Sequence, residues 1–346
     1  MRQRAPEGGS VSRLWKAAQV VGVVVTVGFL VGFVVVPEAS LNVLWNMAIP
    51  LLPLTFLVNA ALWRNLCPLA TLNMTGNRFG ARRRLTNGMI PAAGALGIVL
   101  LVVMVPARRF LFNSDGVAMA ATVGLIAVAA FTLGALFDAK AGFCNSLCPV
   151  LPVERLYGQN PLLAMGNHRC LPCTACTTRA CIDLGPRQSV FHTLGSSAHS
   201  HRWLLTGFGA FAATFPGFVL GYYTVEDAPW TAAGNVYLHV ALWALASYLL
   251  AALAVKTLGL RARVAVPVLG GAAVGIYYWF ATPVLIEAYG ITAAAISPIR
   301  VAFAAVVTLW LWRALAAASE GPIAARHPAD PHRRGSTAPR RGARTT

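Results

Sequence analysis

Residues 117–137 read VAMAATVGLIAVAAFTLGALF, an apolar run without a charged side chain. About 20 apolar residues in a helix cross the hydrocarbon core of a bilayer, so this run predicts a membrane-spanning helix. The chain continues into Phe143-Cys144-Asn145-Ser146-Leu147-Cys148-Pro149-Val150, where two cysteines precede a proline. The element that decides the fold class therefore leads directly into a candidate site for metal chemistry.

The whole chain has the composition of a membrane protein. Of its 346 residues 57% are hydrophobic and only 11% are charged, whereas a soluble domain carries about 25% charged residues. The first apolar run is longer than the apolar part of a signal peptide, about 7–15 residues, so we expect a retained span. We predict an all-α integral membrane protein with about eight transmembrane helices. The expected spans are roughly 17–36, 41–62, 89–105, 117–137, 203–223, 236–255, 264–285 and 294–315.

The basic residues predict the orientation of these spans. Net charge is +17, and all but three of the 28 Lys and Arg residues fall on the side that holds both termini. The other side keeps only Arg108, Arg109 and Arg300. Because Lys and Arg accumulate in cytoplasmic loops, we expect cytoplasmic termini in a bacterial inner (cytoplasmic) membrane. The charge is explained by topology, so lipid is the expected partner and nucleic acid is not.

A cysteine run stands in the segment between the fourth and fifth expected spans. It reads Cys170-Leu-Pro-Cys173-Thr-Ala-Cys176, and Cys181 follows after four more residues. Cysteines at two-residue gaps are typical of iron–sulfur ligation, whereas structural zinc sites pair two separate Cys-x-x-Cys knuckles. All seven cysteines fall in segments expected to be cytoplasmic, where thiols stay reduced. An odd number of reduced cysteines favours metal binding over disulfides.

An internal repeat links the remaining cysteines. Leu66-Cys67-Pro68 aligns with Leu147-Cys148-Pro149 at an offset of 81 residues, each at the end of an apolar run. The second copy has Cys144 four residues before its Cys-Pro pair, and the first copy has Trp63 at that position. This pattern predicts a repeated helical hairpin that ends in a Cys-Pro turn. It makes Cys67 a candidate ligand together with Cys144 and Cys148.

A Cys-x3-Cys-Pro motif at the cytoplasmic end of a span, followed by a ferredoxin-like run, resembles the NapH/NosR/CcoG group of membrane-bound 4Fe-4S ferredoxin-type proteins. The resemblance covers about residues 40–190, and Cys144-Asn-Ser-Leu-Cys148-Pro149 is its most specific part. It implies a protein that passes electrons between quinones, soluble carriers and redox enzymes. Two features depart from the family pattern. Trp63 replaces a cysteine, and there is one ferredoxin run where several relatives have two.

The ligands can be divided between one or two clusters, most simply of the 4Fe-4S type. In a ferredoxin run the first three cysteines serve one cluster and the last serves the other. On that rule Cys170, Cys173, Cys176 and Cys148 hold the first cluster. Cys67, Cys144 and Cys181 hold a second, one ligand short, which His168, Asp183, water or a partner would complete. The rival is a single cluster on Cys170, Cys173, Cys176 and either Cys148 or Cys181.

Other polar and aromatic residues are weaker candidates. Loop histidines are usually solvated, and a single histidine within a span, His239, disfavours bis-histidine haem. Tyr277-Tyr278-Trp279 is better explained by helix packing, although a quinone remains a candidate ligand there. Arg64 and the arginines 82–84 are candidates for docking an acidic ferredoxin or flavodoxin. The loop histidines are His168, His192, His199 and His201.

The sequence thus predicts four parts. Residues 1–137 hold four spans with the hairpin repeat, 138–202 a cytoplasmic ferredoxin-like iron–sulfur module, 203–317 four further spans, and 318–346 a disordered basic tail. No residue pattern indicates a catalytic site. The favoured function is electron transfer between a cytoplasmic carrier and a membrane redox partner or the quinone pool. The alternatives are an iron–sulfur redox sensor or assembly factor for a respiratory or photosynthetic complex, and a zinc-stabilised membrane scaffold.

Overall fold

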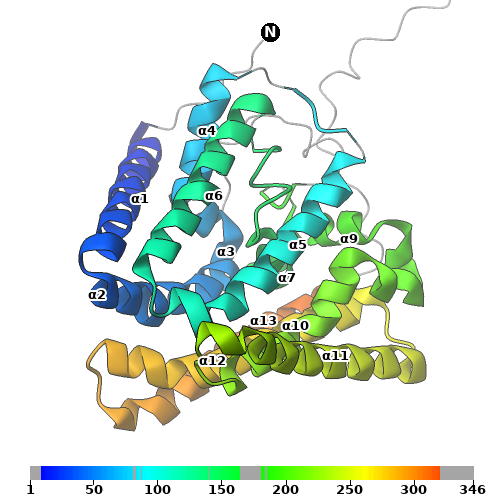
Figure 1. Cartoon of the computed structure of the whole chain (residues 1–346). Coiled ribbons are helices and arrows are strands. Elements are labelled where there is room, and N and C mark those ends of the chain that lie inside the picture. Colours follow the sequence, from blue (N-terminus) through cyan, green and yellow to red (C-terminus); the bar gives the residue numbers. More distant parts are fainter. Residues whose placement is uncertain are drawn as a thin grey trace, which may run out of the picture.

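The computed structural model describes residues 9–80, 83–86, 88–138, 140–163, 181–183 and 185–319. These residues are almost entirely helical, and their only extended pairing is an isolated bridge between Arg83 and Phe137. Figure 1 shows the arrangement. The α-helices are α1 (Gly9–Val35), α2 (Pro37–Asn42), α3 (Leu52–Leu66), α4 (Pro68–Phe79), α5 (Met89–Ala107), α6 (Gly116–Leu136), α7 (Leu151–Gly158), α9 (Pro186–Leu194), α10 (Gly207–Thr224), α11 (Ala233–Leu258), α12 (Ala262–Ala288) and α13 (Ile296–Ser319). The short 3-10 and π segments are η1 (Val43–Ala48), η2 (Ile49–Leu51), η3 (Arg108–Phe112), η4 (Gly195–His199), η5 (His201–Leu205), η6 (Trp230–Ala232) and η7 (Ala293–Ala295).

Within the described ranges, seven helical stretches are long and apolar enough to cross a membrane. This confirms the predicted class, an all-α membrane protein. In six of them few residues are buried in the single chain, as expected where lipid is the solvent, whereas half of the most apolar part of Ala262–Ala288 is buried. The stretches are Arg13–Val35, Pro37–Leu66, Met89–Phe112, Gly116–Leu136, Trp230–Leu258, Ala262–Ala288 and Ala293–Ala317.

The expected fifth span is a different kind of helix. Residues 203–205 belong to η5, and α10 begins only at Gly207. Twelve of the 18 residues of α10 are buried, and the helix is not one of the seven apolar stretches. Its glycines, threonines and tyrosines lower its hydropathy, and its phenylalanines pack within the protein. The described chain thus has seven candidate spans and a central buried helix in place of the eight predicted spans.

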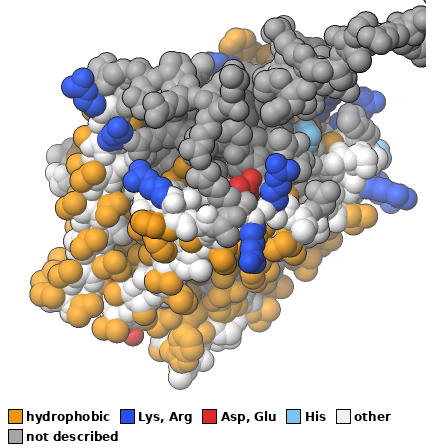
Figure 2. Space-filling model, turned by 90° about the horizontal axis from the view of Figure 1, so that it is seen from above, with side chains coloured by type: hydrophobic (Ala, Val, Ile, Leu, Met, Phe, Trp, Pro, Cys, Tyr) orange, Lys and Arg blue, Asp and Glu red, His pale blue; other side chains and the backbone are white. Residues whose placement is uncertain are grey.

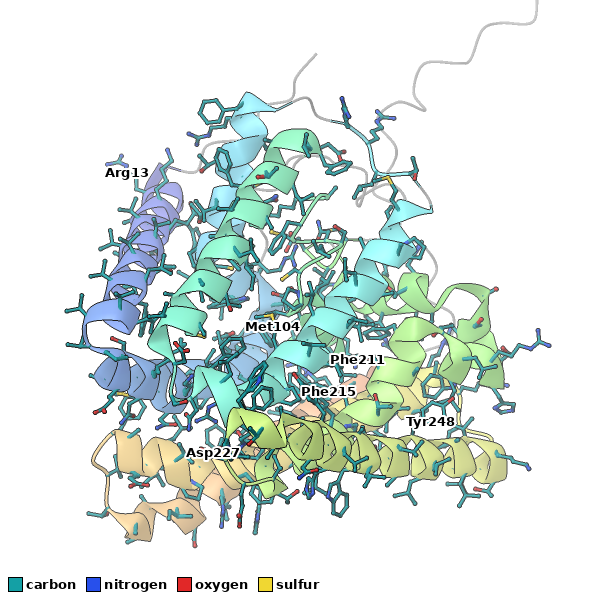
Figure 3. All side chains as sticks on the ribbon, in the orientation of Figure 1. Arg13, Met104, Phe211, Phe215, Asp227 and Tyr248 are labelled. Carbon is teal, nitrogen blue, oxygen red and sulfur yellow. The ribbon has the colours of Figure 1, made fainter. Side chains whose placement is uncertain are left out.

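The main hydrophobic core forms around α10. This helix packs against α11 and α12, and Figure 1 shows α11 crossing beneath the lower end of α5. Phe211 and Phe215 lie in the middle of the molecule, with ring centroids 4.7 Å apart (Figure 3). Leu156 and Tyr157 of α7 are buried in the same core. The core therefore fixes α7, the helix that follows Cys148 and Pro149.

Helix α4 was not predicted, because residues 63–88 were expected to form a loop. It lies along α6 at such close approach that a Cβ atom on Gly134 of α6 would overlap the backbone of Asn73. The Asn73 side-chain amide donates to Ala130 O at 3.0 Å, and that of Asn77 donates to Phe137 O at 2.8 Å. Glycine and buried asparagines therefore hold α4 against α6, which brings Cys67 close to the loop after α6.

One residue from each of the two predicted charge sets marks an end of the molecule. Arg13, from the predicted cytoplasmic set, and Asp227, from the opposite set, lie at opposite ends in Figure 3. The face seen in Figure 2 carries Lys and Arg side chains, and the flanks are mainly hydrophobic. The predicted ferredoxin-like module depends on Cys170, Cys173 and Cys176, which lie outside the described residues, as does most of the predicted tail.

Candidate metal centre

Each Cys-Pro pair lies at the start of a new helix, and in the first copy the pair also follows directly on a helix. α3 ends at Leu66 and α4 begins at Pro68, so Cys67 alone lies between them with φ −57° and ψ 122°. Proline disfavours the helical conformation in the residue before it, which explains the break. Thr71 N donates to Cys67 O at 3.1 Å, so the new helix starts at once. In the second copy, Leu151 N donates to Cys148 O at 3.1 Å as α7 begins.

The chain before the second Cys-Pro pair differs from the predicted hairpin. α3 is helical up to Leu66, whereas α6 ends at Leu136 and residues 140–147 form successive turns. Asn145 N donates to Lys140 O and Cys148 N to Phe143 O, both at 3.0 Å. These turns are buried and fold the loop back, so that Cys144 and Cys148 both lie beside Cys67.

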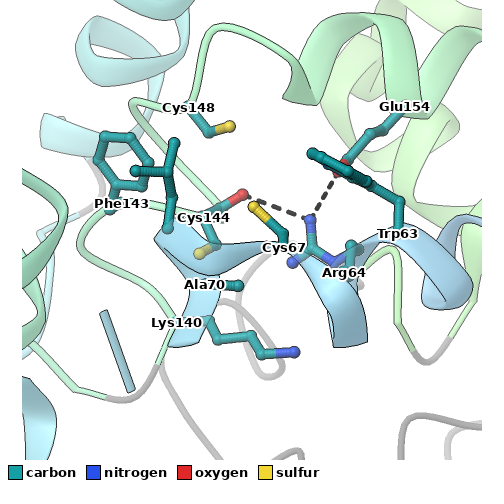
Figure 4. Close-up of a pocket in the computed structure, with 10 residues that line it drawn as sticks. Trp63, Arg64, Cys67, Ala70, Lys140, Phe143, Cys144, Cys148 and Glu154 are labelled. Carbon is teal, nitrogen blue, oxygen red and sulfur yellow. Dashed lines mark hydrogen bonds and ion pairs between the residues drawn. The ribbon is translucent and has the colours of Figure 1, made fainter. Parts of the chain in front are cut away.

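One small pocket collects the cysteines of both copies. Cys67, Cys144 and Cys148 line it together with Trp63 (Figure 4). It holds about 310 Å³ of empty space, which includes open solvent. The other lining residues are Arg64, Leu69, Ala70, Lys140, Phe143 and Glu154.

The pocket disfavours free thiolates. Burial raises the pKa of Cys67 to about 11 and that of Cys144 to about 12, and it raises the pKa of Cys148 as well. Hydrogen bonds from the backbone amides of Ala70 and Leu69 oppose the pKa shift of Cys67. Without a metal these thiols are neutral at physiological pH; a bound metal would deprotonate them.

A buried arginine connects the segments that carry the cysteines. Arg64 is 5% exposed and donates to Asp183 Oδ1 at 2.6 Å and to Glu154 Oε2 at 2.8 Å. It also donates to Asn145 Oδ1 at 2.6 Å and to the carbonyl oxygen of Cys144 at 3.4 Å. Arg64 thereby ties α3 to the turn loop, to α7 and to the residues after Cys181.

Two further charges complete this cluster. The Lys140 ammonium lies 3.4 Å from Asp183 Oδ2, and all four charged side chains are at most 4% exposed. Burial raises the pKa of the Glu154 carboxyl, and the charge of Arg64 opposes that shift. Two cations thus balance two anions beside the pocket. The sequence offered one signal for this cluster: Glu154 and Asp183 are acidic residues in a predominantly basic segment.

The side-chain contacts follow the symmetry of the repeat. Arg64 and Asn145 occupy equivalent positions and bond to one another. Asn73 of α4 and Glu154 of α7 are also equivalent, and each reaches into the other copy. Asn73 Oδ1 accepts from the Cys144 thiol at 3.8 Å, and Glu154 accepts from Arg64. Although the helices before them differ, the two copies therefore meet in a reciprocal manner around the pocket.

The remaining predicted site residues are distributed as follows. Cys181 is buried, and its thiol lies 3.7 Å from Asn145 Oδ1, but it does not line the pocket. Among the described residues, no three His, Cys, Asp or Glu side chains form a group that could hold a single metal ion. His192 and His201 are exposed, and His239 contacts Thr224 Oγ1 at 3.0 Å. The residues outside the described ranges are Cys170, Cys173, Cys176, His168 and Arg82, together with the side chain of His199.

The aromatic triplet of α12 takes part in packing. The Tyr278 ring stacks on Phe303 with centroids 4.0 Å apart, and its hydroxyl donates to Pro50 O at 3.2 Å. The Tyr277 hydroxyl donates to Ile49 O at 3.5 Å. Trp279 is exposed and lies under the Arg300 guanidinium. Both tyrosines thus fasten α12 to η2.

Comparison of the chain with protein-family models, with curated proteins and with solved structures finds no match.

Proposed function

We propose that this chain is a membrane-bound iron–sulfur protein that passes electrons between a cytoplasmic carrier and a membrane partner or the quinone pool. The observation that carries the proposal is the pocket: Cys67, between α3 and α4, and Cys144 and Cys148, in the loop before α7, line one small cavity. Cysteine thiolates are the usual ligands of iron–sulfur clusters. In the proposal Cys170, Cys173, Cys176 and Cys181 supply the remaining ligands.

The surroundings of the pocket suit a cluster. A bound cluster would supply a one-electron carrier, and its potential depends on burial, nearby charge and hydrogen bonds to sulfur. Here the amides of Leu69 and Ala70 bond the Cys67 sulfur, and Arg64 places a cation beside Cys144. Buried neutral thiols without a metal would be chemically inert. Metal binding therefore gives these three residues a role that redox-inactive thiols would lack.

The proposal places the site on the cytoplasmic side, in line with the distribution of basic residues. The burial of Arg64 also reduces the set of arginines that could attract an acidic carrier. Arg64 is buried and fully engaged with acidic partners, so it does not belong to this set. Arg83 and Arg84 are exposed and remain available for docking.

Kinetics of electron exchange test the proposal. The protein is purified without oxygen, reduced with dithionite and mixed with an acceptor in a stopped-flow experiment. A soluble quinone analogue or an oxidised flavodoxin should reoxidise it within seconds. Cys67→Ser is the matched variant and should lose the fast phase. Reoxidation over many minutes by either acceptor would favour a sensor. A protein that takes up no electrons would contradict the proposal outright.

A further inference from the structure

The pocket brings together the four residues at the two cysteine positions of the repeat. Trp63 aligns with Cys144 and Cys67 aligns with Cys148, and these four residues line the same cavity. In Figure 4 Cys144 and Cys148 lie on one side of it and Trp63 on the other. The cavity therefore has the layout of a four-cornered site in which one corner carries an indole ring in place of a thiol.

Among the residues that the structure describes, no side chain replaces that missing thiol. Glu154 lines the pocket, but its Oε2 is held by Arg64 at 2.8 Å. Arg64 and Lys140 are cations and cannot ligate iron. Cys181 is not a lining residue, and its thiol lies beside Asn145 and Asp183. Three thiols thus share the pocket, and on the side of Trp63 the described lining residues offer no further thiol or imidazole.

We propose that Cys67, Cys144 and Cys148 together bind one four-iron cluster whose fourth iron, on the side of Trp63, takes a small exogenous ligand such as a thiol. This rests on the iron–sulfur function proposed above. It differs from a ferredoxin-type division, in which Cys148 would serve the cluster of the 170–176 run. The run would then hold a separate centre with Cys181.

Removal of the run tests the grouping of ligands. In the full-length triple variant Cys170→Ser/Cys173→Ser/Cys176→Ser, purified anaerobically, about half of the wild-type iron and sulfide should remain, with one EPR species. Adding Cys67→Ser should abolish both. If wild-type protein contains iron and sulfide but the triple variant contains none, or contains zinc alone, the grouping is wrong while the iron–sulfur function stands. Wild-type protein without iron and sulfide would overturn the function itself.

The open iron has its own test, made in the wild-type protein and in the triple variant. Adding 2-mercaptoethanol should shift the g values of the reduced cluster. A wild-type spectrum that does not respond to added thiol would overturn the open-iron assignment, because a thiol of the 170–176 run would then occupy that iron. Trp63→Cys supplies the missing thiolate, so its spectrum should no longer respond to the added thiol. Trp63→Phe keeps an aromatic ring without a thiol and should respond as the parent does. Far-UV circular dichroism of each variant checks that it is folded. An identical thiol response in Trp63→Cys and Trp63→Phe would overturn the open-iron assignment.

Discussion

The buried charge cluster makes a quantitative prediction for Arg64→Met. Methionine keeps much of the side-chain length but removes the cation that pairs with Asp183 at 2.6 Å and Glu154 at 2.8 Å. Removing one partner of a buried ion pair costs about 3–5 kcal/mol of folding free energy. Asp183 keeps Lys140 at 3.4 Å, so we expect the lower end, about 3 kcal/mol.

A second substitution isolates the pair. Glu154→Gln leaves Arg64 bonded to Asp183 and should cost about 1–2 kcal/mol, as for a weakened buried hydrogen bond. In Arg64→Met the Glu154 carboxylate has already lost its cation, so Glu154→Gln should add little there. The two effects should therefore fall short of additivity by about 1–2 kcal/mol.

The loss of stability in Arg64→Met should depend on pH. Burial raises the pKa of Glu154 in the folded protein, and loss of Arg64 raises it further. A carboxyl with a raised folded-state pKa destabilises the fold fully above that pKa; the penalty shrinks as pH falls below it and vanishes below the unfolded pKa. The deficit of Arg64→Met should therefore shrink toward acidic pH, and that of Arg64→Met/Glu154→Gln should shrink less.

The assay is unfolding in detergent micelles by titration with SDS, followed by far-UV circular dichroism at several pH values. Arg83→Met is the matched control, because Arg83 is exposed, and its effect should lie within about 0.5 kcal/mol. Strict additivity of Arg64→Met and Glu154→Gln, or wild-type stability of Arg64→Met, would refute the account of this cluster.

Three further predictions follow from other parts of the fold. Gly134→Ala should separate α4 from α6 and reduce the amount of iron that the protein binds, because its Cβ would meet the Asn73 backbone. Gly124 on the same helix faces open space, so Gly124→Ala should do neither, and iron analysis of both variants is the measurement. In metal-free protein, alkylation of Cys67 by iodoacetamide at pH 8 should be about a hundredfold slower than that of an exposed cysteine, because burial raises its pKa to about 11 from an ordinary value of 9.0. The rate should rise as pH approaches that pKa. An enzyme reporter fused to the C-terminus should be active only in its cytoplasmic form, and activity of a periplasmic reporter would contradict the predicted topology.

The apolar runs were predictable because a bilayer imposes one simple requirement. Backbone groups in hydrocarbon must bond within a helix, so long apolar runs become helices wherever they occur. Helix α10 was wrongly predicted as a span because of its phenylalanines, which pack within the protein. Its glycines, threonines and tyrosines leave its hydropathy below that of the seven candidate spans. Helix α4 was not predicted either. Its packing against α6 depends on Gly134, Asn73 and Asn77, and none of these residues indicates a helix in the sequence.

The candidate site was predictable in part. The offset of 81 residues related Cys67 to Cys148 and Trp63 to Cys144, and the four do line one pocket. Arg64 was misread, because a basic residue at a cytoplasmic helix end normally faces water. Its role depends on Asp183, 119 residues away in the chain, and sequence alone does not reveal a contact over that separation.

The measurement that tests the central claim most directly is metal and sulfide analysis of anaerobically purified protein, combined with a redox titration followed by EPR. The account predicts brown protein with iron and acid-labile sulfide in equal amounts and a signal that appears on reduction and disappears on reoxidation. Cys67→Ser, Cys144→Ser and Cys148→Ser should each diminish that signal. Stoichiometric zinc without sulfide, and no reversible signal, would contradict it.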